Sequence, residues 1–248
     1  YGWGTDAWNV DAWNTPRSTS TVTLDARNWS FDNFGEDLIA TVHKGQTFLW
    51  DTSSGTATRA TVISNTPSSS RFNLVSMPDR HVFLFGTETT IGSSTSQDDL
   101  FLRFASQETT NDFAPTATNT AGTFRLDTGN EIRAALQGKD YVFVITDNAA
   151  YVIQFVGPPF TFSVRQVGTN CVCIGQHAAV YVNGIVFWMG SQGGFFAFDG
   201  TVKSLPCLVE DFVFSTDGTN LGLNFNASDV IFSGSNLSLI HISEPTRR

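Results

Sequence analysis

Positive charge is scarce in this sequence. Its only lysines are Lys44, Lys139 and Lys203, which stand far apart, and 14 Lys and Arg residues are set against 23 Asp and Glu residues. The formal net charge is −9 at pH 7. A protein that holds duplex DNA tightly needs clustered Lys and Arg to release counterions from the phosphates. The composition therefore argues against tight nucleic-acid binding.

Long apolar runs and paired cysteines are also lacking. No run approaches the roughly 20 apolar residues that cross a bilayer, so no membrane-spanning segment is expected. Only 3 cysteines occur, and two of them lie two positions apart in a predicted strand, where they would share one face with packing residues. We interpret Cys171, Cys173 and Cys207 as free core thiols in a chain that folds in a reducing cytoplasm.

Motifs of known chemistry are missing too. The histidines His43, His81 and His177 stand beside turns without metal-ligand spacing, and we interpret them as polar turn residues. Segment 127–131 (D-T-G-N-E) lacks the alternating acidic spacing of a calcium loop and is expected to be a solvated turn. Adjacent carboxylates cannot converge on one substrate atom, because neighbours on a strand point to opposite faces. The sequence predicts no catalytic residue, no cofactor and no metal site, so we do not expect an enzyme.

The residues that are abundant favour strands. Apolar residues make up 41% of the chain and charged residues 15%, with 22 Phe and 2 Met, and β-branched residues fill the apolar runs. One phrase recurs: an alternating apolar run, a turn, a second apolar run, and an aromatic residue before another turn. Its clearest copies are residues 37–51 and 178–200, with further copies in residues 132–157 and 72–104.

The aromatic residues in these copies recur about 45 to 55 residues apart, roughly the span of one four-stranded propeller blade. We interpret them as the structural anchors of successive blades: Trp50, Phe104, Phe155 and Phe198. The sequence therefore predicts an all-β fold, a β-propeller-like array of about four to five four-stranded antiparallel blades that is incomplete as a ring.

Strands are expected at 22–24, 38–42, 47–50, 58–64, 72–77, 81–85, 100–104, 124–126, 131–137, 141–146, 150–155, 160–167, 171–175, 178–182, 184–189 and 194–198. Asn183-Gly184 is the strongest hairpin signal in the chain. Gly157-Pro158-Pro159 must lie outside a central strand, because proline cannot donate to a ladder. The long polar connections 87–99 and 106–122 are interpreted as functional edges or subunit contacts.

The two ends differ in character from the middle. Residues 1–20 form a Trp-rich extended segment in which Trp3, Trp8 and Trp13 recur every five residues. We expect these indoles to dock into the chain's own fold, and the alternative is a contact strip for a partner subunit. Residues 21–236 are assigned to the propeller-like domain. Residues 237–247 (L-S-L-I-H-I-S-E-P-T-R) resemble a translated sequencing adapter, so residues 237–248 are excluded from fold reasoning, and the chain is interpreted as a piece of a longer one.

Several longer motifs resemble those of a known family. They are W-S-F-D-N-F-G-E-D-L-I-A (29–40), P-D-R-H-V-F-L-F-G (78–86), P-T-A-T-N-T-A-G (115–122), Q-F-V-G-P-P-F-T-F (154–162), Q-V-G-T-N-C (166–171), and V-F-W-M-G (186–190) with F-D-G-T-V-K-S-L-P-C (198–207). This succession resembles virion structural proteins of tailed phages and is similar to the propeller-forming nozzle or tail-tube proteins of short-tailed phages. The resemblance implies no catalytic residues.

On this basis we expect a phage tail component that forms a ring around the DNA exit channel. Its partners would be other tail subunits and further copies of itself. Duplex DNA would pass through the ring without tight binding. The protein would be located in the virion, which is assembled in the bacterial cytoplasm. Two alternatives stay open. One is a host-surface glycan-binding module that uses surface aromatic residues such as Trp3, Trp8 and Trp13 on sugar faces, and the other is a fragment of a secreted propeller enzyme.

Overall fold

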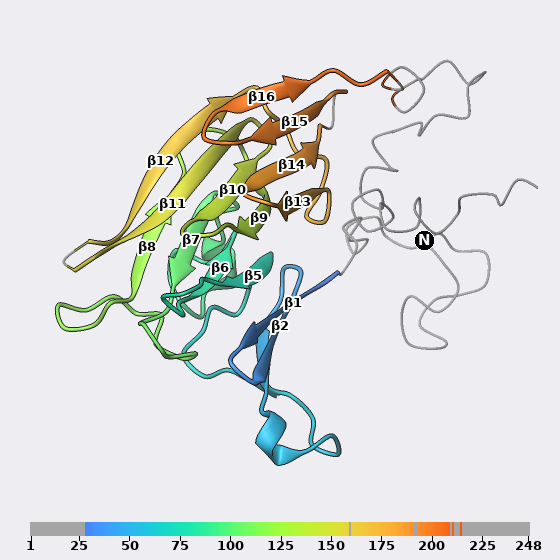
Figure 1. Cartoon of the computed structure of the whole chain (residues 1–248). Helices are drawn as coiled ribbons and strands as arrows, with labels where there is room; N and C mark the ends of the chain where they lie inside the picture. The colour runs from blue at the N-terminus through green and yellow to red at the C-terminus, as the bar shows by residue number, and fades with distance from the viewer. Residues whose placement is uncertain (1–27, 159, 191–192, 209, 211–213, 215–248) are drawn as a thin grey trace, which may run out of the picture.

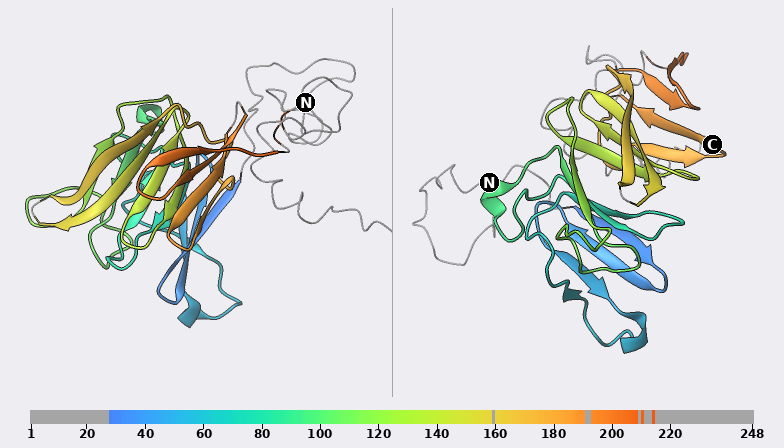
Figure 2. Two further views of the ribbon diagram at one scale, coloured as in Figure 1. Left: turned by 45° about the horizontal axis from the view of Figure 1, so that its top comes forward. Right: turned by 90° about the vertical axis from the view of Figure 1, so that its left-hand side faces the viewer.

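The computed structural model describes residues 28–158, 160–190, 193–208, 210 and 214. In this part of the chain, sixteen strands form four separate sheets of four strands each, and each sheet is an antiparallel meander. Figure 1 and Figure 2 show the sheets following one another in chain order, from the blue strands to the orange ones. The predicted fold class, an all-β, β-propeller-like array of four-stranded blades, is confirmed.

The four sheets are named blades 1 to 4. Blade 1 contains β1 (Trp29–Phe34), β2 (Asp37–Val42), β3 (Thr47–Trp50) and β4 (Thr61–Val62). Blade 2 contains β5 (Phe72–Val75), β6 (Val82–Phe85), β7 (Phe101–Phe104) and β8 (Gly122–Arg125). Blade 3 contains β9 (Ile132–Gln137), β10 (Val142–Thr146), β11 (Ala149–Gly157) and β12 (Thr161–Thr169). Blade 4 contains β13 (Ala179–Val182), β14 (Ile185–Met189), β15 (Phe195–Phe198) and β16 (Val202–Leu205).

The first strands of the blades lie side by side: β1 against β5, β5 against β9, and β9 against β13. Strands β1 and β5 are aligned parallel, because the cross-blade hydrogen bonds between them keep a constant offset. Ser30 Oγ donates to the Asn73 carbonyl at 3.1 Å, and the Asp32 carboxylate accepts from the Val75 N–H at 2.7 Å, both with an offset of 43 residues. Between β5 and β9, Met77 N–H donates to Gln137 Oε1 at an offset of 60 residues.

Apolar residues fill the three seams between successive blades. At the first seam, Ile39 and Leu49 of blade 1 pack against Val75, Val82 and Leu84 of blade 2. The second seam holds Phe72, Leu74, Phe83, Phe85, Leu102 and Phe104 of blade 2 with Ile132, Val142, Val144, Tyr151, Ile153 and Phe162 of blade 3. The third seam holds Ala134, Phe143, Ile145, Ala150 and Val152 of blade 3 with Val186, Trp188 and Phe198 of blade 4. The core is therefore a series of sheet-on-sheet layers.

Turn chemistry places two hairpins. Asn183 and Gly184 adopt φ of 50° and 89° between β13 and β14, which confirms the predicted tight hairpin. Gly157 ends β11 at φ 78°, and its pairing with Thr161 closes the long β11–β12 hairpin. Figure 1 shows this hairpin reaching past the neighbouring strands, and Phe160 at its tip is 77% exposed.

Four strand expectations differ from the structure. Strands β1 and β16 were not predicted, and the strand expected at 58–64 shrinks to Thr61–Val62. The strand expected at 171–175 is absent from the described fold. This segment instead crosses from blade 3 to blade 4, where Cys171 N–H donates to the Asn148 carbonyl and Ile174 N–H to the Met189 carbonyl. The expected strand at 22–24 lies outside the described residues.

Replacing Phe83 with alanine tests the central seam. Phe83 is fully buried, and its ring lies 5.5 Å from that of Phe104 and 5.0 Å from that of Phe162. We expect Phe83→Ala to lower the free energy of unfolding by about 3–5 kcal/mol, measured by urea denaturation. The matched control Phe160→Ala deletes a phenyl ring that is exposed to solvent, and it should change the free energy of unfolding by less than about 0.5 kcal/mol. Equal effects at both positions would contradict the assigned seam.

Candidate functional site

The four predicted anchors all lie in the third strand of a blade, although they do not face the same seam. Trp50, Phe104, Phe155 and Phe198 lie in β3, β7, β11 and β15, the third strand of each blade. Phe104 and Phe198 are buried in seams, whereas Phe155 and Trp50 are partly exposed. The Trp50 indole donates to the Thr58 carbonyl at 3.1 Å. The tryptophans proposed as partner contacts, Trp3, Trp8 and Trp13, lie outside the described residues.

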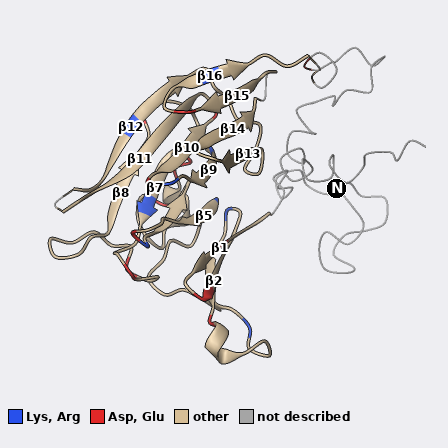
Figure 3. Ribbon diagram, in the orientation of Figure 1, with Lys and Arg blue, Asp and Glu red and all other residues tan. Residues whose placement is uncertain are grey.

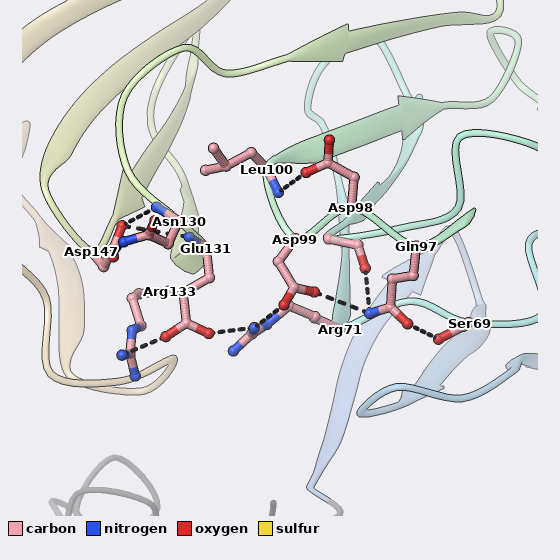
Figure 4. Close-up of polar contacts among 11 residues, drawn as sticks. Ser69, Arg71, Gln97, Asp98, Asp99, Leu100, Asn130, Glu131, Arg133 and Asp147 are labelled. Atoms are coloured by element: carbon pink, nitrogen blue, oxygen red, sulfur yellow. Dashed lines mark hydrogen bonds and ion pairs between the residues drawn. The ribbon is translucent and has the colours of Figure 1, made fainter. Parts of the chain in front are cut away.

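A network of charged side chains joins blades 2 and 3 where their first strands begin (Figure 4). Arg71 forms ion pairs with Asp99 at 3.2 Å and with Glu131. Glu131 also pairs with Arg133, and Gln97 Nε2 donates to Asp99 at 3.1 Å. We call these five residues the seam network. Because Arg71 and Glu131 are mostly buried, their attraction is screened by water less than that of a surface pair.

Local backbone features place the two arginines. Gly86, at φ 55°, leaves room for the Arg71 stem, since a Cβ there would lie 2.4 Å from Arg71 Cδ. In blade 3, Thr146 pairs with Ile132 and Ile145 pairs with Ala134, so Arg133 is the extra residue of a β-bulge. Bulges redirect the side chain that they carry. Arg133 Nε is buried without a hydrogen-bond partner among the described residues.

Asp147 holds the turn that carries Glu131. Its carboxylate accepts hydrogen bonds from the Asn130 N–H at 2.7 Å and from Asn130 Nδ2 at 2.9 Å. Partial burial raises the pKa of Asp147, but the hydrogen bonds from Asn130 and Glu131 outweigh it and hold this pKa below its usual value. Gly129 allows this close approach, because a Cβ there would lie 2.4 Å from Asp147 Oδ1. The turn predicted to be solvated is therefore bonded to the body of blade 3.

The arrangement is suited to fastening blades together. Each guanidinium of the network meets a carboxylate, so the charges are compensated within the seam. Asp98 and Asp99 point to different partners, Arg125 and Arg71, as expected for neighbours. Among the described residues, no group of three or more His, Cys, Asp or Glu could hold a metal ion. Sequence reasoning missed this network, because the pairing of Arg71 with Glu131 depends on the alignment of β5 with β9.

A second buried charge secures the long loop 87–99. Arg103 of β7 is buried, and its guanidinium donates to the carbonyls of Glu88, Thr89 and Phe113. Burial lowers the pKa of Arg103, and the nearby Glu88 charge opposes that shift. The Glu88 carboxylate accepts from Ser68 Oγ and from the Gly92 N–H. The connection predicted as a functional edge is thus firmly attached to blade 2.

The prediction that His81 is a polar turn residue is wrong. Its side chain is fully buried at the second seam, with ring centroids of Phe104, Phe155 and Phe162 within 5.9 Å. Nδ1 donates to the Ala105 carbonyl at 2.7 Å, and Nε2 has no partner among the described residues. Burial lowers the pKa of His81, while the Ala105 carbonyl and the charges of Asp79 and Glu108 oppose this shift. The neutral imidazole packs as one more ring of the core.

The cysteines are free, as predicted. Cys171 and Cys173 are buried, and burial raises the pKa of Cys171 to about 11 and that of Cys173 to about 12. These thiols therefore stay protonated and unreactive at neutral pH. Cys207 is only partly buried, so its assignment to the core is wrong.

No protein-family model and no curated protein matches the chain. Solved structures with a similar fold include Hsv2 of Kluyvelomyces marxianus, at 10% identity and a TM-score of 0.38, covering 68% of this chain and 44% of that one. BBS1N in complex with ARL6DN matches at 10% identity and a TM-score of 0.44, covering 77% and 56%. An apocarotenoid oxygenase of Synechocystis matches at 13% identity and 0.37, covering 73% and 48%.

The chain thus spans about half the length of these solved structures. Likeness at this level carries no information about activity. The structure also contains no helix long and apolar enough to cross a membrane among the residues it describes.

Glu131→Gln tests the seam network. The substitution keeps the shape of the side chain but removes the charge that both Arg71 and Arg133 meet. We expect the free energy of unfolding to fall by about 1.5–3 kcal/mol, the usual worth of hydrogen bonds to charged groups, as measured by urea denaturation. The control Asp199→Asn removes an exposed ion pair with Lys203 and should leave stability unchanged. A Glu131→Gln chain as stable as the wild type would refute a fastening role.

His81 gives the stability of the chain a pH dependence. Its pKa is lowered in the folded state, so as the pH falls below about 6.5 the unfolded chain takes up a proton that the folded chain does not. Stability is therefore present above pH 6.5 and is lost on acidification, with a slope of at most about 1.4 kcal/mol per pH unit. In His81→Asn, which keeps a donor for Ala105, denaturant unfolding between pH 5 and 7 should show a shallower slope. An unchanged slope would rule out His81 as the titrating group.

Proposed function

We propose that this chain is a structural component of a tailed-phage virion, a nozzle or tail-tube-like subunit of a ring around the DNA exit channel. The observation that carries the proposal is that the seams use charged groups as fasteners. Arg71, Glu131 and Asp99 tie blade 2 to blade 3, and Asp32 ties blade 1 to blade 2. Together with the sequence motifs that resemble phage tail proteins, this supports a scaffold rather than a catalyst.

Rigidity follows from the way the blades are joined. Three apolar seams bury the faces of adjacent sheets, and the aligned first strands add hydrogen bonds and ion pairs across the first two seams. In such arrays the stability of each unit depends on contacts with its neighbours, so the whole body resists deformation. A subunit that guides DNA under pressure needs this resistance more than it needs a reactive site.

The charge of the chain suits a passage through which DNA slides. The net charge is −9, and Figure 3 shows the few Lys and Arg residues scattered over the described strands and loops. Arg71, Arg125 and Arg133 are paired with carboxylates, and Arg103 is buried in blade 2. A surface of this kind repels phosphates, so a duplex passes without being held. The proposed partners are other tail subunits and further copies of the chain, in a virion assembled in the bacterial cytoplasm.

Duplex binding by the purified chain tests the proposal. We expect no binding of labelled duplex DNA at physiological salt, measured by fluorescence anisotropy, because 14 Lys and Arg residues against 23 Asp and Glu residues release few counterions from the phosphates. The matched control reverses three exposed acidic residues, Glu36→Lys, Asp127→Lys and Asp140→Lys, which changes the net charge from −9 to −3 (three times +2). This variant should gain weak binding that disappears at higher salt.

Tight duplex binding by the wild-type chain would overturn the conduit proposal.

The same preparation can be applied to a glycan array. Specific glycan binding would favour a host-recognition module, because sugars pack on exposed aromatic rings such as that of Phe31, whereas an array without hits is the result that the proposal predicts.

A further inference from the structure

The two end blades each present an apolar face to solvent. Within the part of the chain that the structure describes, blade 1 packs against blade 2 through one face, and blade 4 packs against blade 3 through one face. On the opposite face of blade 1, Trp29 is 47% exposed and Phe31 is 61% exposed. On the opposite face of blade 4, Val180 is 52% exposed and Val182 is 45% exposed. Both faces belong to sheets whose other face forms a seam.

The exposed face of blade 1 is aromatic, and we call it the aromatic end face. Paired residues on adjacent strands share a face, and the pairing gives one row across the blade: Phe31, Ala40, Phe48 and Val62. Trp29 lies on the same face, since its ring is 6.0 Å from that of Phe31 and 5.9 Å from that of Phe48.

The exposed face of blade 4 is mainly aliphatic, and we call it the aliphatic end face. Its row across the blade is Val180, Phe187, Ala197 and Lys203. Val182 and Ile185 pair beside this row and lie on the same face. Phe214 packs on Phe195 at 5.6 Å, at one edge of the blade, while Val180 and Val182 keep about half of their surface in solvent.

The seam between blades 3 and 4 shows how two such faces fit together. Blade 3 contributes the row Leu136, Phe143, Val152 and Arg165. Blade 4 receives it on the row Tyr181, Val186, Phe198 and Val202. At the centre of this seam, the ring of Phe143 lies 4.7 Å from that of Phe198.

The two end faces repeat these two rows position by position. From the first strand to the fourth, the row of the aliphatic end face consists of an aliphatic residue, a phenylalanine, a second aliphatic residue and a basic residue. The row that blade 3 contributes to its seam has the same four residue types in the same order. The aromatic end face has an aromatic residue, a small aliphatic residue, a phenylalanine and a valine, as blade 4 has in its receiving row. The end faces are therefore complementary in the same way as an existing seam.

We propose that the aliphatic end face of one chain docks on the aromatic end face of a second copy of this chain. The contact continues the blade-on-blade packing across the subunit boundary, with Phe187 of one copy seated near Phe48 of the other. The contact is head-to-tail, because it joins two different faces. Such a contact forms a closed ring only if the rotation from each copy to the next leads back to the first copy. A pair of chains in which this contact forms twice uses both end faces of each copy, so a dimer is the expected assembly. This proposal rests on the two faces and not on the tail function.

Mass measurement by size-exclusion chromatography with light scattering tests the contact. The wild-type chain should run as a dimer. Phe31→Asp buries a charge in the aromatic end face, and Val180→Asp does so in the aliphatic end face, so each should weaken self-association by at least about tenfold and run as a monomer. The control Phe160→Asp places the same charge on the exposed hairpin tip and should leave the dimer intact.

Mixing the two variants distinguishes this geometry from a symmetric contact. The Phe31→Asp chain keeps its aliphatic end face, and the Val180→Asp chain keeps its aromatic end face. One intact contact can form between them, so dimer mass should reappear in the mixture although each variant alone is monomeric. A symmetric contact, in which one face meets the same face of a second copy, would leave at least one of the two variants dimeric on its own, because that variant keeps the self-pairing face.

Hydrogen exchange on the wild-type chain provides a readout that needs no substitution. Peptides that cover β1, β3, β13 and β14 should exchange more slowly in the associated state than on dilution, while those of β7 and β10 should not change. A chain that stays monomeric when concentrated, with both end faces covered by its own residues, would overturn the proposal. A dimer that survives both Phe31→Asp and Val180→Asp would overturn it equally.

Discussion

Each of these sheets is apolar on both faces, and no sheet can bury both of its faces alone. This constraint explains why the sheets are stacked face to face, one after another along the chain. A blade in the middle of the array, such as blade 2, packs one face against the preceding blade and the other against the following one. Burial of this kind is proportional to area and not directional, so it stacks the blades but does not set how one blade is aligned with the next.

Polar groups at the seams provide the alignment. The Asp32 carboxylate holds the Val75 N–H, Gln137 binds the backbone of Met77, and Glu131 meets Arg71. Burial raises the pKa of Asp32, and the hydrogen bonds from the Val75 and Asn33 N–H groups offset only part of that shift. Such contacts are directional, and each is satisfied in one register only. The apolar seams therefore hold the blades together, and the polar contacts fix how each blade is aligned with the next.

The sequence predicted most strands because their apolar runs are continuous or alternate, as in Val142–Thr146 and Ala179–Val182. It could not reveal β1, in which Ser30 and Asp32 are turned toward a neighbouring blade while Trp29 and Phe31 face solvent, the reverse of the usual pattern. His81 was misjudged because its polarity favours a turn, whereas three phenylalanine rings surround it. The seam network was beyond prediction, because its offset of 60 residues depends on the long connections of blade 2. The assignment of Trp3, Trp8 and Trp13 as partner contacts remains a prediction.

A body whose blades are joined by directional seams suits a subunit of a larger ring. The resemblance of its motifs to phage tail proteins and its acidic charge make a DNA passage the function that we propose. Sequencing the DNA that flanks this reading frame in its source genome tests that claim most directly. The proposal predicts genes for portal and tail proteins beside it. A neighbourhood of metabolic genes, with a secretory signal encoded upstream in the same frame, would contradict it.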